Sequence, residues 1–377
     1  MADDVRRITS LAVWDGSPER AEPVRWSEVA PTVVPRQTVV SVEVSDADGA
    51  VTGVAGLTYY VPADEESDDG RVDASLSAWL GATVDGLPRE RGAPNPYDPT
   101  AKPLRATVEL AVLDALGRAT SLPAAAFLGG IRRRRLRAYA SLPSFADPES
   151  AVACARAAVE AGLRAVKFHA SGLLEVDLET IARARRELGA SFDLMWDASC
   201  AYDLYTAVAV GGALAEANFL WFEAPLADDS TEALRSLAGR TRVPLIPDGL
   251  VQRPAAEWAR DVRDGLWGAL RLDVTRAPDL RAALRLLHLA EALGLPCEVQ
   301  SFGFPLAQWA NLQLMLTSDA CRFFEVPFPP ADLADDVASP PTIVDGCVRL
   351  PEGPGLAHAI DVGELARRLK PLIQMSL

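Results

Sequence analysis

From residue 136 to 328 the chain repeats one pattern of hydrophobic and polar positions. A short apolar, β-branched or aromatic run ends in a polar residue, and a stretch rich in Ala, Leu and Arg with helical spacing follows it. The repeat predicts one strand and one helix per unit. The eight runs are RLRAYAS, AVKFHAS, FDLMWDAS, NFLWFEAP, VPLIPDG, ALRLDVT, PCEVQSF and CRFFEVP.

The stretches between the runs have the spacing of amphipathic helices. In VDLETIARARRELG, Leu178, Ile181 and Leu188 share one face, and Gly189 is placed to end the helix. LRAALRLLHLAEALG, 280–294, repeats this arrangement and ends at Gly294. Eight strands that alternate with helices predict an α/β fold with a parallel (β/α)8 barrel, whose active site lies at the carboxyl ends of the strands.

Seven of the eight runs end in a polar residue at nearly constant spacing. The successive gaps are 28, 26, 25, 25, 27 and 25 residues. A doubly wound open sheet would explain the alternation equally well, but it gives no reason for polar residues at so many consecutive strand ends. The polar residues are His169, Asp197, Glu223, Asp248, Asp273, Gln300 and Glu325.

Residues 1–130 have a different pattern and predict a separate α+β unit. RQTVVSVEVSD and VTGVAGLTYY read as strands separated by the turn signal DADG, and a helix is expected over 104–119. The barrel is expected to span residues 131–330. The segment 331–377 carries its own turn signals, and we expect it to pack back on the first unit.

Composition and charge limit the partners of the chain. It has 377 residues, 49% hydrophobic and 24% charged, with a net charge of -15, which suits a soluble protein with a large core and disfavours nucleic acid and anionic membranes as partners. The five cysteines are widely spaced without a CxxC pair, so neither a disulfide framework nor a zinc site is indicated. With no signal-peptide pattern at the amino terminus, a cytoplasmic protein is expected.

Three acids end three consecutive runs and predict a metal site. Asp197, Glu223 and Asp248 would converge at the carboxyl ends of neighbouring strands, where their charges repel unless a cation or a proton intervenes. An all-oxygen site suits a hard divalent ion, and Mg²⁺ is favoured. The competing interpretation is a purely structural barrel in which arginines pair with these acids.

Lys167 and His169 lie on the same face of their strand, because side chains alternate along it. If this face points into the barrel, the pair lies opposite the three acids and suits acid–base chemistry. A cation that holds a substrate carboxylate, with a base beside it, is the arrangement needed to remove the proton α to that carboxylate. The simpler alternative is a half-exposed strand whose polar side faces water.

The sequence resembles the enolase superfamily, and within it the mandelate racemase-like subgroup, especially the acid-sugar dehydratases. The similarity extends over nearly the whole chain. It includes ELAVLDALGRATSLPAAAFLGG before the barrel, and then in order VKFHAS, MWDAS with the following AYD, WFEAP, IPDG, DVT, CEVQSFGFPLAQWANLQLML and FFEVP. The resemblance implies a modified (β/α)7β barrel with an N-terminal α+β capping domain.

The resemblance also implies roles for individual residues. Asp197, Glu223 and Asp248 would be the Mg²⁺ ligands, Lys167 would neighbour the substrate carboxylate, and His169 would be the base for the α-proton. Glu325 would hydrogen-bond to the bound substrate or intermediate. Relatives carry an Asp–His dyad on the sixth and seventh strands, whereas this chain has Asp273 and Gln300, and an amide is neither a general acid nor a general base.

With Gln300 on one side of the substrate, racemisation by two opposed bases is disfavoured. We therefore expect a Mg²⁺-dependent dehydratase of an acid sugar, in which His169 removes the α-proton and returns it to the leaving β-hydroxyl. A cycloisomerase or epimerase of the same superfamily is the second interpretation, and a descendant that binds metal without catalysis is the third. The expected partners are a small carboxylate substrate and further copies of the chain, since members of the family commonly form homo-oligomers.

Overall fold

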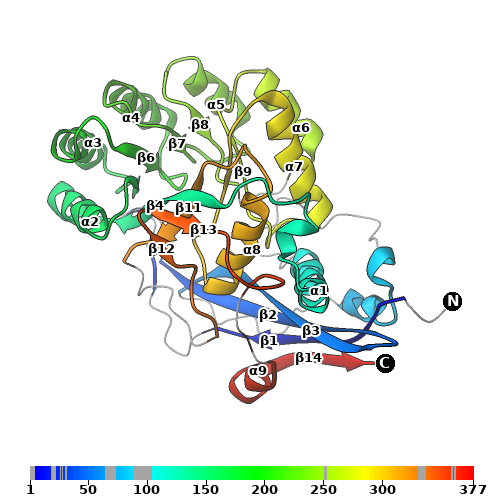
Figure 1. The fold of residues 1–377 in the computed structure, drawn as a ribbon. Helices are drawn as coiled ribbons and strands as arrows, with labels where there is room; N and C mark the ends of the chain where they lie inside the picture. The colour runs from blue at the N-terminus through cyan, green and yellow to red at the C-terminus, as the bar shows by residue number, and fades with distance from the viewer. Residues whose placement is uncertain are drawn as a thin grey trace.

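The structure is a computed structural model that describes residues 5–17, 23–25, 27, 29, 32–63, 74–87, 104–249, 253–329, 337–357, 360 and 362–377. It contains an antiparallel sheet that lies across one side of a ring of parallel strands and helices (Figure 1). The predicted mixed α/β fold is confirmed. None of the described helices has the length and apolar character needed to cross a membrane.

The antiparallel sheet joins the two ends of the chain in the order β14-β1-β2-β3. In the predicted DADG turn, the Asp46 carboxylate accepts hydrogen bonds from the backbone N–H of Asp48 (2.9 Å) and of Gly49 (3.1 Å). The strands are β1 (Arg7–Asp15), β2 (Val33–Asp46), β3 (Gly49–Pro62) and β14 (Lys370–Ser376).

Helix α1 (Leu104–Thr120) packs on this sheet, close to the predicted bounds. A Cβ atom on Gly53 of β3 would lie 2.1 Å from the backbone oxygen of Ala111, so glycine is what permits this close approach. Among the described residues of this unit, three short 3-10 helices flank it: η1 (Ala74–Trp79), η2 (Val84–Gly86) and η3 (Ala124–Ala126).

Eight parallel strands form the ring. Strands β4 to β8 pair in chain order, β9 pairs with β10, and β11 pairs with β4. The strand pairing is interrupted between β8 and β9 and between β10 and β11. Backbone hydrogen bonds bridge these places, from the N–H of Gly268 to the carbonyl of Leu245 (2.9 Å) and from the N–H of Cys297 to the carbonyl of Ala320 (3.0 Å). The strands are β4 (Arg135–Ser144), β5 (Ala165–His169), β6 (Asp193–Asp197), β7 (Phe222–Glu223), β8 (Leu245–Ile246), β9 (Leu270–Leu272), β10 (Cys297–Val299) and β11 (Phe323–Pro327).

Seven helices connect these strands and cover the outside of the ring (Figure 1). Two predicted helix ends are confirmed: α3 stops before Gly189 (φ 87°) and α7 stops before Gly294 (φ 67°), in backbone conformations that favour glycine. The helices are α2 (Pro148–Glu160), α3 (Leu174–Leu188), α4 (Leu204–Glu216), α5 (Thr231–Ala238), α6 (Ala255–Arg263), α7 (Leu280–Leu293) and α8 (Pro305–Met315).

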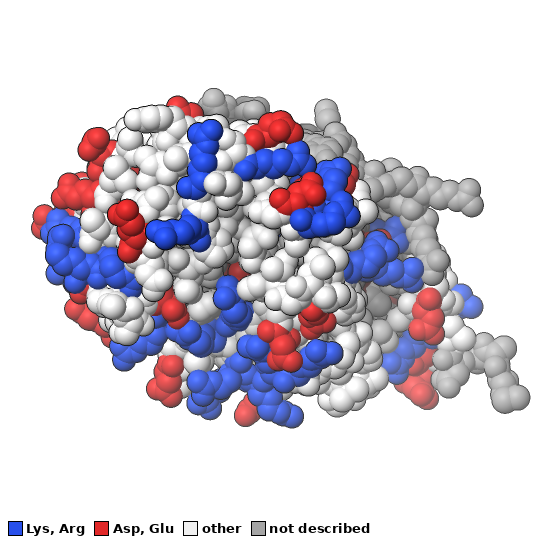
Figure 2. Space-filling view, turned by 90° about the horizontal axis from the view of Figure 1, so that it is seen from above, with Lys and Arg blue, Asp and Glu red and all other residues white. Residues whose placement is uncertain are grey.

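After β11 the chain returns to both parts of the molecule. Strands β12 (Ile343–Val344) and β13 (Cys347–Arg349) form a hairpin, and β13 pairs antiparallel with β4. Helix α9 (Val362–Arg368) then leads to β14, which pairs with β1. On the face seen from above, basic and acidic side chains are interspersed (Figure 2).

Candidate functional site

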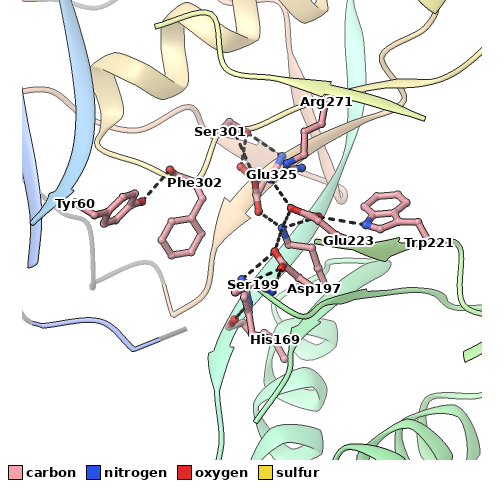
Figure 3. Close-up of polar contacts among 12 residues, drawn as sticks. Tyr60, His169, Asp197, Ser199, Trp221, Glu223, Arg271, Ser301, Phe302 and Glu325 are labelled. Carbon is pink, nitrogen blue, oxygen red and sulfur yellow. Dashed lines mark hydrogen bonds and ion pairs between the residues drawn. The ribbon is translucent and has the colours of Figure 1, made fainter. Parts of the chain in front are cut away.

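A cavity of 160 Å³ lies where the barrel strands end. Seven of the eight site residues predicted from the sequence line it, and Asp273 is the exception. The lining residues are Tyr60, Lys167, His169, Asp197, Ser199, Cys200, Glu223, Asp248, Arg271, Gln300, Phe302 and Glu325. The structure therefore brings together side chains from the capping sheet and from most of the barrel strands (Figure 3).

Lys167 is the central cation of the site. It is 1% exposed, and every residue of β5 is buried, so the interpretation of a half-exposed strand is wrong. Its Nζ contacts Asp197 Oδ2 (3.0 Å), Glu223 Oε2 (3.1 Å) and Glu325 Oε1 (2.9 Å). Burial alone would lower the pKa of Lys167, but the charges of Glu223 and Glu325 outweigh it and raise that pKa well above its usual value. Lys167 is therefore a permanent cation rather than a base.

The ring of His169 is oriented by the backbone. Its Nδ1 lies 2.5 Å from the carbonyl oxygen of Leu142, and a carbonyl oxygen only accepts, so Nδ1 carries a proton. The other nitrogen, Nε2, lies 3.2 Å from Asp197 Oδ2. Because Nδ1 is occupied by the Leu142 carbonyl, Nε2 is the ring nitrogen that faces the other groups of the site and can exchange a proton with a ligand.

Asp197 and Glu223 end adjacent strands, β6 and β7, and are paired in register. Ser199 holds Asp197 by donating to Oδ1 from both its N–H (2.8 Å) and its hydroxyl (3.2 Å). The indole of Trp221 donates to Glu223 Oε2 (3.3 Å). These contacts fix the direction of each carboxylate.

Asp248 follows β8 and completes the predicted group of acids. Burial raises the pKa of Asp248 to about 7, and the nearby charges of Asp228 and Asp197 act in the same direction. The backbone N–H of Asp248 donates to Asp228 Oδ1 (3.2 Å), which fixes the turn. A carboxyl group of this kind is poised to exchange its proton for a cation.

The acids fit a divalent cation by charge and by ligand type. Four carboxylates line the cavity against the cations Lys167 and Arg271, so with all four ionised, as a bound cation favours, the side chains carry an excess of two negative charges. The donors are hard oxygen atoms, as Mg²⁺ prefers. Among the described residues, no group of three or more His, Cys, Asp or Glu side chains has the arrangement of a metal site. The Lys167 ammonium instead contacts two of the predicted ligands, Asp197 and Glu223.

Glu325 is held as an anion. Its carboxylate contacts Lys167 and Arg271 (Nη2 to Oε2, 3.3 Å) and accepts the backbone N–H of Ser301 (3.3 Å). Burial would raise the pKa of Glu325, but the charges of Lys167 and Arg271 lower it to about 2. In this state Glu325 accepts hydrogen bonds from a ligand and has no proton to donate.

Asp273 and Gln300 follow neighbouring strands but differ in surroundings. Asp273 Oδ1 accepts hydrogen bonds from the N–H and hydroxyl of Thr275 (2.9 and 2.8 Å) and from the side chain of Asn311 (2.9 Å). These bonds hold Asp273 outside the cavity lining. Gln300 lines the cavity, and its Oε1 is buried without a hydrogen-bond partner.

Sequence reasoning missed Arg271 and Tyr60. Arg271 is 2% exposed and forms an ion pair with Glu223 Oε1 (3.0 Å), but in the run ALRLDVT it looks like a solvent-side residue. The only indication in the sequence that Arg271 belongs to the site was its position two residues before Asp273, because residues two apart in a strand point to the same face. Tyr60 reaches the cavity from β3 of the capping sheet, where its hydroxyl donates to the Phe302 carbonyl (3.3 Å). No sequence signal indicates that contact.

The interpretation of a purely structural barrel predicts that arginines pair with all three acids. Within the described residues, Arg271 forms ion pairs with Glu223 and Glu325, and no arginine forms an ion pair with Asp197 or Asp248. Arginine pairing therefore accounts for only part of the cluster.

The amino-acid sequence is similar to those of known proteins. Residues 150–364 match the enolase C-terminal domain-like family. Muconate cycloisomerase 1 of Pseudomonas putida is 26% identical over 350 residues, which cover 88% of this chain and 90% of that protein.

Solved structures share the fold over nearly the whole chain. A mandelate racemase/muconate lactonizing enzyme from Pseudovibrio sp. has a TM-score of 0.83 at 21% identity, with 99% of this chain and 100% of that chain covered. D-glucarate dehydratase from Agrobacterium tumefaciens, complexed with magnesium, has a TM-score of 0.76 at 21% identity, with 97% and 99% covered.

Proposed function

The chain belongs to the enolase superfamily, in the mandelate racemase/muconate lactonizing enzyme family, and from this premise we propose that it is a Mg²⁺-dependent dehydratase of an acid sugar. Members of this family include cycloisomerases, racemases and dehydratases, so family membership alone does not choose the reaction. The observation that supports the proposal most directly is that Nε2 of His169 lies in one small cavity with four carboxylates and a buried lysine.

His169 would act twice on the same face of the substrate. Nε2 takes the proton from the carbon α to the carboxylate, and the electron pair of that C–H bond moves toward the carboxylate group. The same proton then passes from Nε2 to the β-hydroxyl while the electron pair returns from the carboxylate group to form a double bond between the α- and β-carbons, so the C–O bond breaks and water leaves. The enol that remains tautomerises to a 2-keto-3-deoxy acid, so atoms and charge balance without a second base.

Asp197, Glu223 and Asp248 would hold the cation. When bound, Mg²⁺ would neutralise the charge that develops on the substrate carboxylate as the α-proton leaves. Lys167 lies between two of these ligands and adds a second fixed positive charge. Gln300 is suited to hydrogen-bond with a substrate hydroxyl, because its buried Oε1 lacks a partner.

A cycloisomerase is the second candidate, and the similarity to muconate cycloisomerase 1 over most of both chains favours it. That protein's name describes a reaction without loss of water. The two candidates predict different products from a carboxylate, although both require a proton transfer at the α-carbon.

The test is incubation of the protein with Mg²⁺ and acid sugars of four to six carbons in D₂O. We expect a 2-keto-3-deoxy acid product from at least one substrate, detected as its semicarbazone. Exchange of the α-proton without loss of water would replace the dehydratase by an isomerase. Neither signal across the panel, with Mg²⁺ bound, would favour a descendant without catalysis.

A further inference from the structure

Arg271 is a permanent cation in the floor of the cavity, and no role in the proposed reaction uses it. Its Nη2 forms an ion pair with Glu223 Oε1 (3.0 Å) and donates a hydrogen bond to Glu325 Oε2 (3.3 Å) (Figure 3). A guanidinium does not lose its proton in proteins, so this charge is fixed at every working pH. Its stem packs below the turn after Asp248, since a Cβ atom on Gly249 (φ +75°) would lie 2.7 Å from Arg271 Cγ.

The placement of its two partners does not depend on Arg271. Glu223 is also held by Lys167 on both oxygens (3.2 and 3.1 Å) and by the indole of Trp221 (3.3 Å). Glu325 is also held by Lys167 (2.9 Å) and by the backbone N–H of Ser301 (3.3 Å). What Arg271 alone contributes is therefore its charge.

Local stability does not account for this arginine. Its Nε and Nη1 are buried and lack hydrogen-bond partners. Unpaired buried donors destabilise a protein, and hydrophobic side chains in place of buried ion pairs are often neutral or stabilising. A role in ligand binding gives a reason for a charge at this position that local stability does not.

The charge of Arg271 matters most when an anion enters. The four carboxylates and two cations of the cavity become neutral overall when one divalent cation binds. Without Arg271 the loaded cavity would keep one negative charge and would repel a carboxylate, in surroundings where burial reduces screening. Arg271 should also repel the incoming metal ion slightly.

We infer that Arg271 is a charge-setting residue that allows the cation-loaded site to accept an anionic substrate. This inference rests on the proposed function, because it assumes a site that binds both a divalent cation and a carboxylate. It differs from a role in holding the metal ligands, because the two roles change the Mg²⁺ affinity in opposite directions when Arg271 is replaced.

The experiment uses Arg271→Met, Arg271→Lys and the control Arg253→Met. Arg253 is also a largely buried arginine paired with acids, Glu257 (3.1 Å) and Asp261, but it lies outside the cavity. Calorimetric titration first measures the affinity for Mg²⁺ alone. A second titration adds oxalate, a planar dianion that resembles an enediolate, to the Mg²⁺-saturated protein. Circular dichroism verifies that each variant is folded.

In Arg271→Met we expect Mg²⁺ to bind at least as tightly as in the wild type and oxalate to bind at least tenfold more weakly. Arg271→Lys, which keeps the charge, should stay within about threefold of the wild type, and Arg253→Met should change neither affinity. A parallel loss of both affinities in Arg271→Met, or undiminished oxalate binding, would overturn the inference. The proposed dehydratase function fails separately, if the wild type forms no 2-keto-3-deoxy acid from any acid sugar of the panel.

Discussion

Lys167→Met tests the electrostatic structure of the site most severely, because it removes one cation from among three carboxylates. Lys167 Nζ lies 2.9–3.1 Å from Glu325, Asp197 and Glu223, and the side chain is 1% exposed. Methionine has a similar length and fills the space without charge. Without added metal, at least one carboxylate must then take up a proton or remain buried without a counter-ion.

The expected loss of stability follows from the cost of protonation. At pH 7 a carboxyl group with an ordinary pKa near 4 is about three pH units above its pKa, which corresponds to about 4 kcal/mol. Removal of one partner from a buried ion pair costs about 3–5 kcal/mol, in agreement. At pH 5.5 the same protonation costs about 2 kcal/mol, so the loss should shrink by about 2 kcal/mol as the pH falls.

The direction of this pH dependence follows from the carboxyl group that takes up a proton in the folded variant. Its pKa is then raised above the unfolded value near 4, so the variant is destabilised most at neutral pH and less as the pH falls toward that value. The lost pairing of Glu325 adds no trend in this range. With a folded pKa of about 2, that pairing contributes equally at pH 7 and pH 5.5, and its contribution disappears only as the pH falls from about 4.5 toward 2.

Urea unfolding in EDTA, at pH 7 and pH 5.5, measures both quantities. The control is Lys370→Met on the exposed strand β14, which should change the free energy of unfolding by less than about 0.5 kcal/mol. A deficit below about 1 kcal/mol for Lys167→Met at pH 7, or one that does not depend on pH, would refute the reasoning.

Three other predictions address separate parts of the structure. Because the pKa of Asp248 is raised to about 7, the wild-type Mg²⁺ affinity, measured by calorimetry, should fall as the pH drops from 8 to 6. Over the same range the metal-free protein should become more stable in urea unfolding. Asp248→Asn should lose this stability trend and should bind Mg²⁺ weakly at both pH values. Gly53→Ala should lower the free energy of unfolding by about 1–3 kcal/mol in urea, since its Cβ would collide with α1; unchanged stability would contradict that contact. Gln300→His restores a base, and NMR of recovered substrate should show deuterium at an inverted α-carbon; retention of configuration would argue against His at this position as a second base.

The sequence pattern predicts most of the site because, in a barrel, the place of a residue in its strand fixes where its side chain lies. The period of two placed Lys167 and His169 on one face, and the regular spacing placed Asp197, Glu223 and Asp248 at consecutive strand ends; the structure has all five around one cavity. Both steps need only local alternation and the parallel order of the strands.

Other features depend on contacts that local patterns do not encode. Asp273 leaves the cavity lining because Asn311, on α8 and 38 residues away, donates to its carboxylate. Tyr60 reaches the cavity only because the capping sheet lies over the barrel. Arg271 becomes a cation of the site only because the folded ring brings β9 close enough to β7 for an ion pair with Glu223. Each depends on the tertiary arrangement of distant segments.

The most direct test of the central claim is the rate of α-deuterium exchange in D₂O for wild type and His169→Asn, both saturated with Mg²⁺. The substrate is the acid sugar that the wild type processes, and Mg²⁺ affinity is measured in parallel to show that the carboxylates remain intact. We expect exchange to fall by at least 10²-fold in His169→Asn with Mg²⁺ affinity nearly unchanged. Exchange at the wild-type rate in the variant would show that His169 is not the base.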